Sequence, residues 1–138
     1  MRKHIALKNK RAHGFMLIEV LVSVLLFSVG VLALVGLQAN MTRAQTESKT
    51  RADASYLASE LIGMMWSDIN NLTSYNTDQC ANNSRCVGWT SKVTDTLPSG
   101  QATVTVDPLN PGDVRIIIQW TLPDGGTHNF TTSTTIQA

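Results

Sequence analysis

The chain has 138 residues, a formal net charge of +1 and 15% charged residues, a composition that excludes a strongly basic nucleic-acid-binding protein. Its apolar fraction of 43% excludes a chain that is disordered throughout. The charges are segregated: residues 1–13 hold five basic and no acidic side chains, residues 15–37 hold one charge, and residues 38–138 hold six basic and nine acidic side chains. This order of basic, apolar and mildly acidic parts is typical of a protein addressed to a membrane.

Residues 15–37, called here the apolar segment, are apolar on every face of a helix. Such a helix would be about 35 Å long at ~1.5 Å per residue, and a hydrocarbon core is roughly 30 Å thick. The basic residues precede it, so the positive-inside rule predicts a cytoplasmic N-terminus and a translocated body. Two simpler interpretations are an ordinary single-pass anchor and a cleavable secretory signal, for which Val31-Leu32-Ala33 offers a cleavage site.

Two residues of this region are left unexplained by a plain anchor. Glu19 is the only charge in the apolar segment, and a carboxylate there costs roughly 2.5–3.5 kcal/mol unless it finds a partner. No Lys or Arg lies between residues 15 and 42. Gly14 stands at the junction of the polar and apolar parts, where it leaves the backbone accessible to a protease. Cleavage before Phe15 would create an α-amine four residues from Glu19.

The run Gly14-Phe15-Met16-Leu17-Ile18-Glu19-Val20-Leu21 resembles the signal of type IV pilins and type II secretion pseudopilins. The resemblance implies cleavage between Gly14 and Phe15 by a prepilin peptidase, N-methylation of the Phe15 amine, and pairing of Glu19 with the amine of a neighbouring subunit. It also implies that the partners are other minor and major pilins. The subunit would reside in the inner membrane, with its head in the periplasm, and then in a pilus at the cell surface.

The helix is expected to continue to residue 66, because no proline occurs before Pro98. From residue 38 the pattern is amphipathic, with apolar side chains at roughly helical spacing: Met41, Ala44, Ala52, Tyr56, Leu57, Leu61, Ile62, Met65 and Trp66. We expect residues 38–66 to pack one face, including the Met64-Met65-Trp66 cluster, against a sheet.

Residues 67–100 lack a clear period and predict a long connection between helix and sheet. This stretch holds the only cysteines, Cys80 and Cys86. Two cysteines in a translocated body predict a disulfide. A weak alternation at the end of the stretch suggests a first strand at Val87, Trp89, Ser91 and Val93.

Clear alternation over residues 101–138 predicts strands with inward-facing Ala102, Val104 and Val106, then Val114, Ile116, Ile118, Trp120 and Leu122, and lastly Phe130 and Ile136. Pro123-Asp124-Gly125-Gly126 predicts a turn between the last two strands. The expected fold class is α+β, with an antiparallel sheet of three to four strands packed on the C-terminal half of the long helix. The pilin resemblance implies the same lollipop architecture, in which residues 67–138 form the globular head.

No pattern in the sequence predicts an enzyme. After cleavage the one remaining histidine is His128, and no nucleophile elbow, phosphate loop, zinc spacing or dinucleotide motif is present. The loop from Asp107 to Asp113 offers three oxygen side chains that could bind calcium, but it matches no EF-hand and reads more simply as a turn. We expect no cofactor, no metal, no nucleic acid and no small-molecule substrate.

Within the pilin family, Gly36-Leu37-Gln38-Ala39, Arg43 and Leu57-Ala58-Ser59-Glu60-Leu61 resemble PilV-like minor pilins, also called type IV pilus modification proteins. This implies a role in a minor-pilin complex that primes assembly and caps the pilus tip, with a contribution to adhesion in some relatives. A minor pseudopilin of type II secretion is the alternative within the family. A membrane-anchored adhesin or sensor that never polymerises is the alternative outside it.

Overall fold

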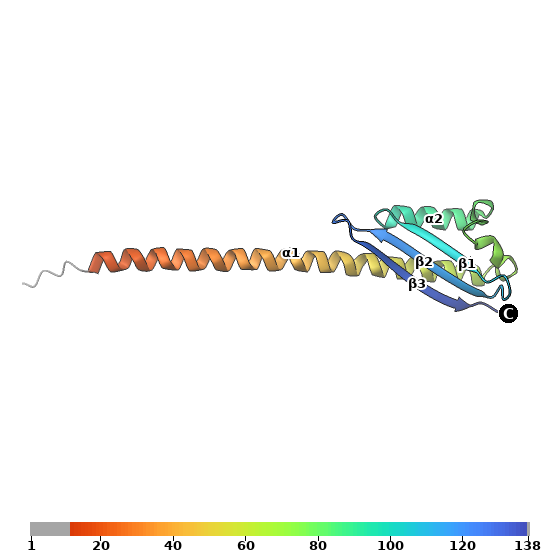
Figure 1. Ribbon diagram of the computed structural model, residues 1–138, viewed down its shortest axis with the longest axis horizontal. Helices are drawn as coiled ribbons and strands as arrows, with labels where there is room; N and C mark the ends of the chain where they lie inside the picture. Colours follow the sequence, from red (N-terminus) through yellow and green to blue (C-terminus); the bar gives the residue numbers. More distant parts are fainter. Residues whose placement is uncertain (1–11, 138) are drawn as a thin grey trace, which may run out of the picture. The chain divides into compact units, whose positions relative to one another are not determined.

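The computed structural model describes residues 12–137. Its main elements are helix α1 (Ala12–Trp66), helix α2 (Ser84–Thr96) and strands β1 (Gln101–Val106), β2 (Asp113–Thr121) and β3 (Thr127–Thr135) (Figure 1). Two short 3-10 helices, Ile69–Tyr75 and Cys80–Asn82, connect α1 to α2. The chain divides into two compact units, one ending at Gln45 and one, called here the packed unit, beginning at Thr46. Helix α1 contributes residues to both.

Helix α1 includes the whole predicted range 15–66. It contains no proline, the residue that removes a hydrogen bond inside a helix. Gly30 and Gly36 are each about 1 kcal/mol less favourable than Ala there, and the helix continues through both. Apart from its chain neighbours and the nearby backbone of the same helix, a Cβ added at either glycine would meet no atom within 4 Å, so packing among the described residues requires neither glycine.

The packed unit confirms the predicted α+β class. Its three strands form an antiparallel sheet in the order β1-β2-β3, with Val104 opposite Ile116 and Ile116 opposite Thr132. The alternation predicted from the sequence is confirmed in β1 and β2, where the buried side chains are Val104, Val106, Val114, Ile116, Ile118 and Trp120. One face of the sheet therefore belongs to the core, and the other carries polar residues toward solvent.

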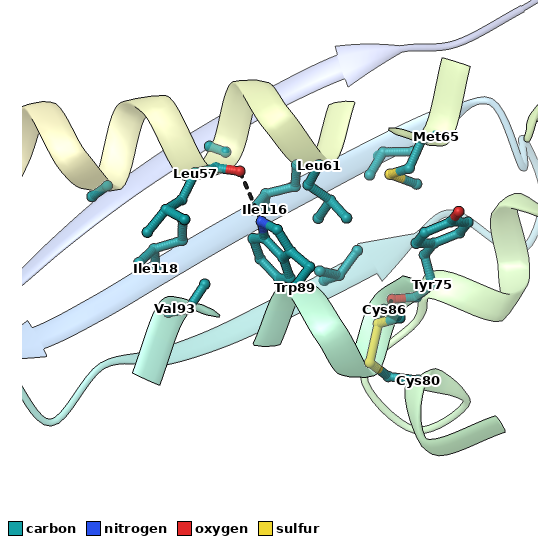
Figure 2. Close-up of a cluster of buried hydrophobic side chains, with 14 of the residues drawn as sticks. Leu57, Leu61, Met65, Tyr75, Cys80, Cys86, Trp89, Val93, Ile116 and Ile118 are labelled. Atoms are coloured by element: carbon teal, nitrogen blue, oxygen red, sulfur yellow. Dashed lines mark hydrogen bonds between the residues drawn. A yellow bond between two sulfur atoms is a disulfide. The ribbon is translucent and has the colours of Figure 1, made fainter. Parts of the chain in front are cut away.

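The core is closed by one face of α1 and one face of α2 (Figure 2). On α1 the fully buried side chains are Ala54, Leu57, Ala58, Leu61 and Met65, which are spaced three and four residues apart and so share one helix face. The predicted packing of this half of the helix on the sheet is confirmed. Five expected members are not in it. Met41, Ala44 and Ala52 are exposed, Tyr56 is 64% exposed and Trp66 is 49% exposed.

The strand suggested at 87–93 is wrong, because this stretch lies inside helix α2. Its buried side chains are Cys86, Trp89 and Val93, again three and four residues apart. Val87, which had suggested the alternation, is 42% exposed. Packing of this apolar face outweighs the modest helix penalty of the Val and Thr residues in the segment.

The start of α2 has a local cause in the sequence. Asn83 precedes the helix in an extended conformation, and its side-chain oxygen accepts hydrogen bonds from the backbone N–H groups of Arg85 and Cys86. This is a helix N-cap, which satisfies donors that have no partner inside the helix. With α2 and the two 3-10 helices, most of the predicted connection 67–100 is helical.

The two aspartates at the ends of the loop between β1 and β2 both accept hydrogen bonds from the chain. Asp107 Oδ1 accepts hydrogen bonds from the backbone N–H groups of Leu109 and Asn110. Asp113 Oδ1 accepts one from the hydroxyl of Thr135, at 2.7 Å. The Asp107 contacts are those of a turn stabilised by an aspartate, and the Asp113 contact joins β2 to β3.

Candidate assembly site on helix α1

The apolar segment is exposed along its whole length within the unit that ends at Gln45. Phe15 is 82% exposed, Leu25 62% and Leu34 65%. A contiguous apolar surface of this extent marks a membrane or protein interaction site. By length and composition, α1 is one helix that could cross a membrane.

Polar groups inside this segment are satisfied by the helix itself. The hydroxyl of Ser23 donates a hydrogen bond to the carbonyl oxygen of Glu19, and that of Ser28 donates to the carbonyl oxygen of Val24, each at 2.7 Å. Backbone and hydroxyl groups that are paired within one helix can enter hydrocarbon, where no water is available to replace a missing partner. The carboxylate of Glu19 is the exception.

The side chain of Glu19 is exposed and pairs with no basic side chain among residues 15–137. It lies four residues after Phe15 on a continuous helix, so the two side chains share one face. Gly14 belongs to the same helix, and residues 1–11 of the predicted leader lie outside the described residues. The structure thus places Phe15 and Glu19 on the same face of an uncovered apolar helix.

The second pair of predicted residues is in the packed unit, where Cys80 and Cys86 form the predicted disulfide (Figure 2). It joins the second 3-10 helix to the first turn of α2, and both cysteines are buried. The disulfide constrains the connection and offers no free thiol, so its role is structural. It belongs to a different unit from Glu19 and takes no part in the apolar surface.

Three contacts of the packed unit were not predicted from the sequence. Trp89 Nε1–H donates to the carbonyl oxygen of Leu57 at 2.8 Å, which ties α2 to α1 (Figure 2). His128 lies with Nδ1 3.6 Å from Glu47 and stacks on Trp120. The Trp89–Leu57 and His128–Glu47 pairs are 32 and 81 residues apart in sequence, so no local spacing could have indicated these two contacts.

The third contact is a cluster at the end of α1, where Asp68 accepts hydrogen bonds from Asn71 Nδ2 at 2.7 Å and from the Tyr75 hydroxyl at 3.1 Å. The bond from Asn71 is the main reason that the pKa of Asp68 is held below its ordinary value of 3.8, with help from Tyr75 and Arg85. Burial is the main reason that the pKa of Tyr75 is raised, and its bond to Asp68 adds to this.

Among residues 12–137, no group of three or more His, Cys, Asp or Glu side chains gathers closely enough to hold a metal ion. The chain matches no protein-family model, and no curated protein or solved structure is similar enough to register as a relative. The resemblance to pilins therefore remains a prediction based on the residues themselves.

Proposed function

We propose that this chain is a minor pilin of the type IV pilus, of the PilV-like group, that joins other minor pilins in a complex priming pilus assembly at the tip. The observation that carries the proposal is the carboxylate of Glu19. It stands on a helix whose apolar surface is exposed on every side, four residues after Phe15. An unpaired acid in such a surface is costly in lipid and becomes favourable only when another molecule brings a positive charge.

The proposed mechanism follows from that charge. A prepilin peptidase removes residues 1–14, the new Phe15 amine is methylated, and the apolar segment holds the subunit in the inner membrane with its head in the periplasm. The apolar segments of neighbouring subunits then pack together, and Glu19 of one subunit pairs with the Phe15 amine of the next. The proposal gives the chain no catalytic group, cofactor or small-molecule substrate.

Leader removal is tested by measuring the intact mass of the full-length protein expressed in cells that contain the peptidase. We expect a chain that begins at Phe15 and carries one methyl group. Gly14→Val should leave the leader attached, because the added side chain obstructs the protease at the cleaved bond. An unprocessed wild-type chain would instead favour a permanently anchored adhesin or sensor.

Assembly is tested with Glu19→Val, and the matched control is Ser23→Ala, one helical turn further along the same face. For a plain anchor, the valine would improve insertion and leave function intact. For a pilin, it leaves the neighbour's ammonium unpaired, which costs about 3–5 kcal/mol for buried pairs.

We therefore expect Glu19→Val to be processed and inserted normally but to crosslink poorly to partner pilins and to lower the number of pili. Ser23→Ala should behave as wild type. Normal crosslinking and normal piliation in Glu19→Val would refute the pairing role.

A further inference from the structure

The two edges of the sheet differ in whether their backbone groups are occupied. At the β1 edge, Thr77 N–H donates to the Val104 carbonyl at 3.1 Å, and Val104 N–H donates to Thr77 Oγ1 at 2.8 Å. Val106 N–H donates to Asn76 Oδ1 at 2.7 Å. The segment before α2 therefore covers this edge and blocks it from pairing with another strand.

The β3 edge is open. The bonds from Leu122 N–H to Gly126 O and from Ile136 N–H to Gly112 O lie in register with the β2–β3 pairing. Hydrogen-bonded and non-hydrogen-bonded positions alternate along an antiparallel pair of strands. The even-numbered residues of β3, which lie between Gly126 and Ile136, therefore bond to β2. The odd-numbered residues direct their N–H and C=O groups away from it: Thr127, Asn129, Thr131, Ser133 and Thr135. All five are exposed, and no strand lies beyond β3 in the described part of the chain.

The β3 strand also lacks the features that usually protect an edge. Proteins block open edges with charged residues, prolines or bulges. The nine residues Thr127–Thr135 include no Lys, Arg, Asp, Glu or Pro, and their pairing with β2 is regular from end to end. The outward side chains are hydroxyls and one amide, which suit an uncharged neighbouring strand.

We propose that the open edge of β3 binds an extended, uncharged strand of another subunit in the assembly, which adds a fourth strand to the sheet. This inference rests on the proposed function, because it requires a neighbouring subunit. The backbone groups of β3 provide the attachment, as in other cases of strand addition, and the closed β1 edge limits the addition to one side.

A second copy of this chain is a poor source of that strand. Its own β1 edge is closed. In each copy, the helical stretch 46–66 and β3 run in the same direction. Antiparallel pairing of β3 with a second β3 would therefore make the helical stretches of the two copies run in opposite directions. His128 contacts Glu47 near the start of both, and Ile136 lines a pocket with Ile69 just beyond their ends. Opposed helices do not suit subunits that are anchored through the same helix in one membrane.

The test uses the full-length protein, expressed with the other pilins of its system and carrying a photo-crosslinking amino acid at Asn129. We expect an adduct with another pilin, at a peptide from an edge strand. Thr131→Pro removes one outward N–H, and proline is tolerated at an edge position whose N–H faces solvent. It should lower the adduct about five-fold or more, as expected for losing a backbone hydrogen bond. Thr131→Val retains the N–H and should crosslink like wild type.

Thr131→Lys provides a second variant that leaves the backbone unchanged and places a charge at the edge, so it keeps the test valid if the proline lowers the amount of folded protein. Absence of an adduct, or an adduct that survives both Thr131→Pro and Thr131→Lys, would overturn the inference. The intact mass and pilin crosslinking of each sample are recorded in parallel. A processed chain that associates with pilins but gives no strand adduct would overturn the inference alone and leave the proposed function standing.

Discussion

The two ends of helix α1 carry the same kinds of apolar side chain, which are exposed at the N-terminal end and buried at the C-terminal end. Leu25 is 62% exposed, and every large apolar side chain from Phe15 to Leu37 is likewise exposed. Leu61 is fully buried and belongs to a core that includes two helices and a sheet. The difference lies in the pattern around each residue, because the apolar segment has no polar face and residues 46–66 have one.

This comparison separates two sources of stability. The packed unit buries its apolar face within the chain, so its folding free energy comes largely from that burial. The apolar segment gains nothing comparable until a membrane or other helices cover it. Substitutions in the two regions should therefore change different measurements, and all three tryptophans lie in the packed unit, where near-ultraviolet circular dichroism of the full chain in detergent can follow its unfolding.

The largest expected effect is from Leu61→Ala, with Leu25→Ala as the matched control. Removing a fully buried leucine leaves a cavity in the core and should lower the free energy of unfolding by about 2–5 kcal/mol. Leu25→Ala removes the same atoms from an exposed surface and should leave unfolding of the packed unit unchanged. Equal losses in the two variants would contradict the separation of the two regions.

Reduction of the Cys80–Cys86 disulfide should have the next largest effect. The two cysteines are six positions apart, and opening so short a ring should cost about 2–2.5 kcal/mol in the chain-entropy model. The Cys80→Ser/Cys86→Ser variant should lose the same amount and should still insert into membranes, because the apolar segment is separate from the disulfide. Identical unfolding midpoints for the oxidised and reduced chains would mean that the disulfide contributes nothing.

A smaller loss is expected for Trp89→Phe, which keeps an aromatic side chain in the core but removes the donor to the Leu57 carbonyl. A hydrogen bond of this kind contributes about 0.5–1.5 kcal/mol, and some loss of packing adds to it. Trp66→Phe is the control, because Trp66 is 49% exposed and its substitution should change the unfolding free energy less. A larger loss for Trp66→Phe would contradict the assigned contact between α2 and α1.

Much of the fold could be predicted from the sequence because its strongest patterns are long. The apolar segment is uniform over many turns, and the alternation at Val114, Ile116, Ile118 and Trp120 matches only a strand. Helix α2 is not predicted, because the weak alternation of Val87, Trp89, Ser91 and Val93 suggests a strand instead. With Cys86 counted, the spacing to Trp89 and Val93 and the Asn83 cap both indicate a helix.

The functional features of the molecule also divide into those that the sequence shows and those that only the folded structure shows. Glu19 could be singled out from the sequence because a charge in an apolar helix is unusual wherever it occurs. Gly14 and Phe15 could be singled out because they stand where the basic part meets the apolar segment. The closed edge of β1 could not, because Thr77 and Val104 meet only after the sheet has formed. The open edge of β3 can be recognised only when the structure shows that the β1 edge is covered and the β3 edge is not.

The last prediction compares the two regions through one carboxylate in each, Asp68 and Glu19. Asp68 accepts hydrogen bonds within the packed unit, mainly from Asn71, and its pKa is lowered in the folded state. A lowered pKa stabilises the fold above the ordinary value of 3.8, and this contribution disappears as the pH falls through the folded value. Asp68→Asn should therefore be slightly less stable than wild type at neutral pH, and the difference should shrink as the pH falls below 3.8. Glu19→Gln should unfold like wild type throughout, because Glu19 belongs to the other unit. A constant difference between Asp68→Asn and wild type across this range would contradict the role assigned to the charged form of Asp68.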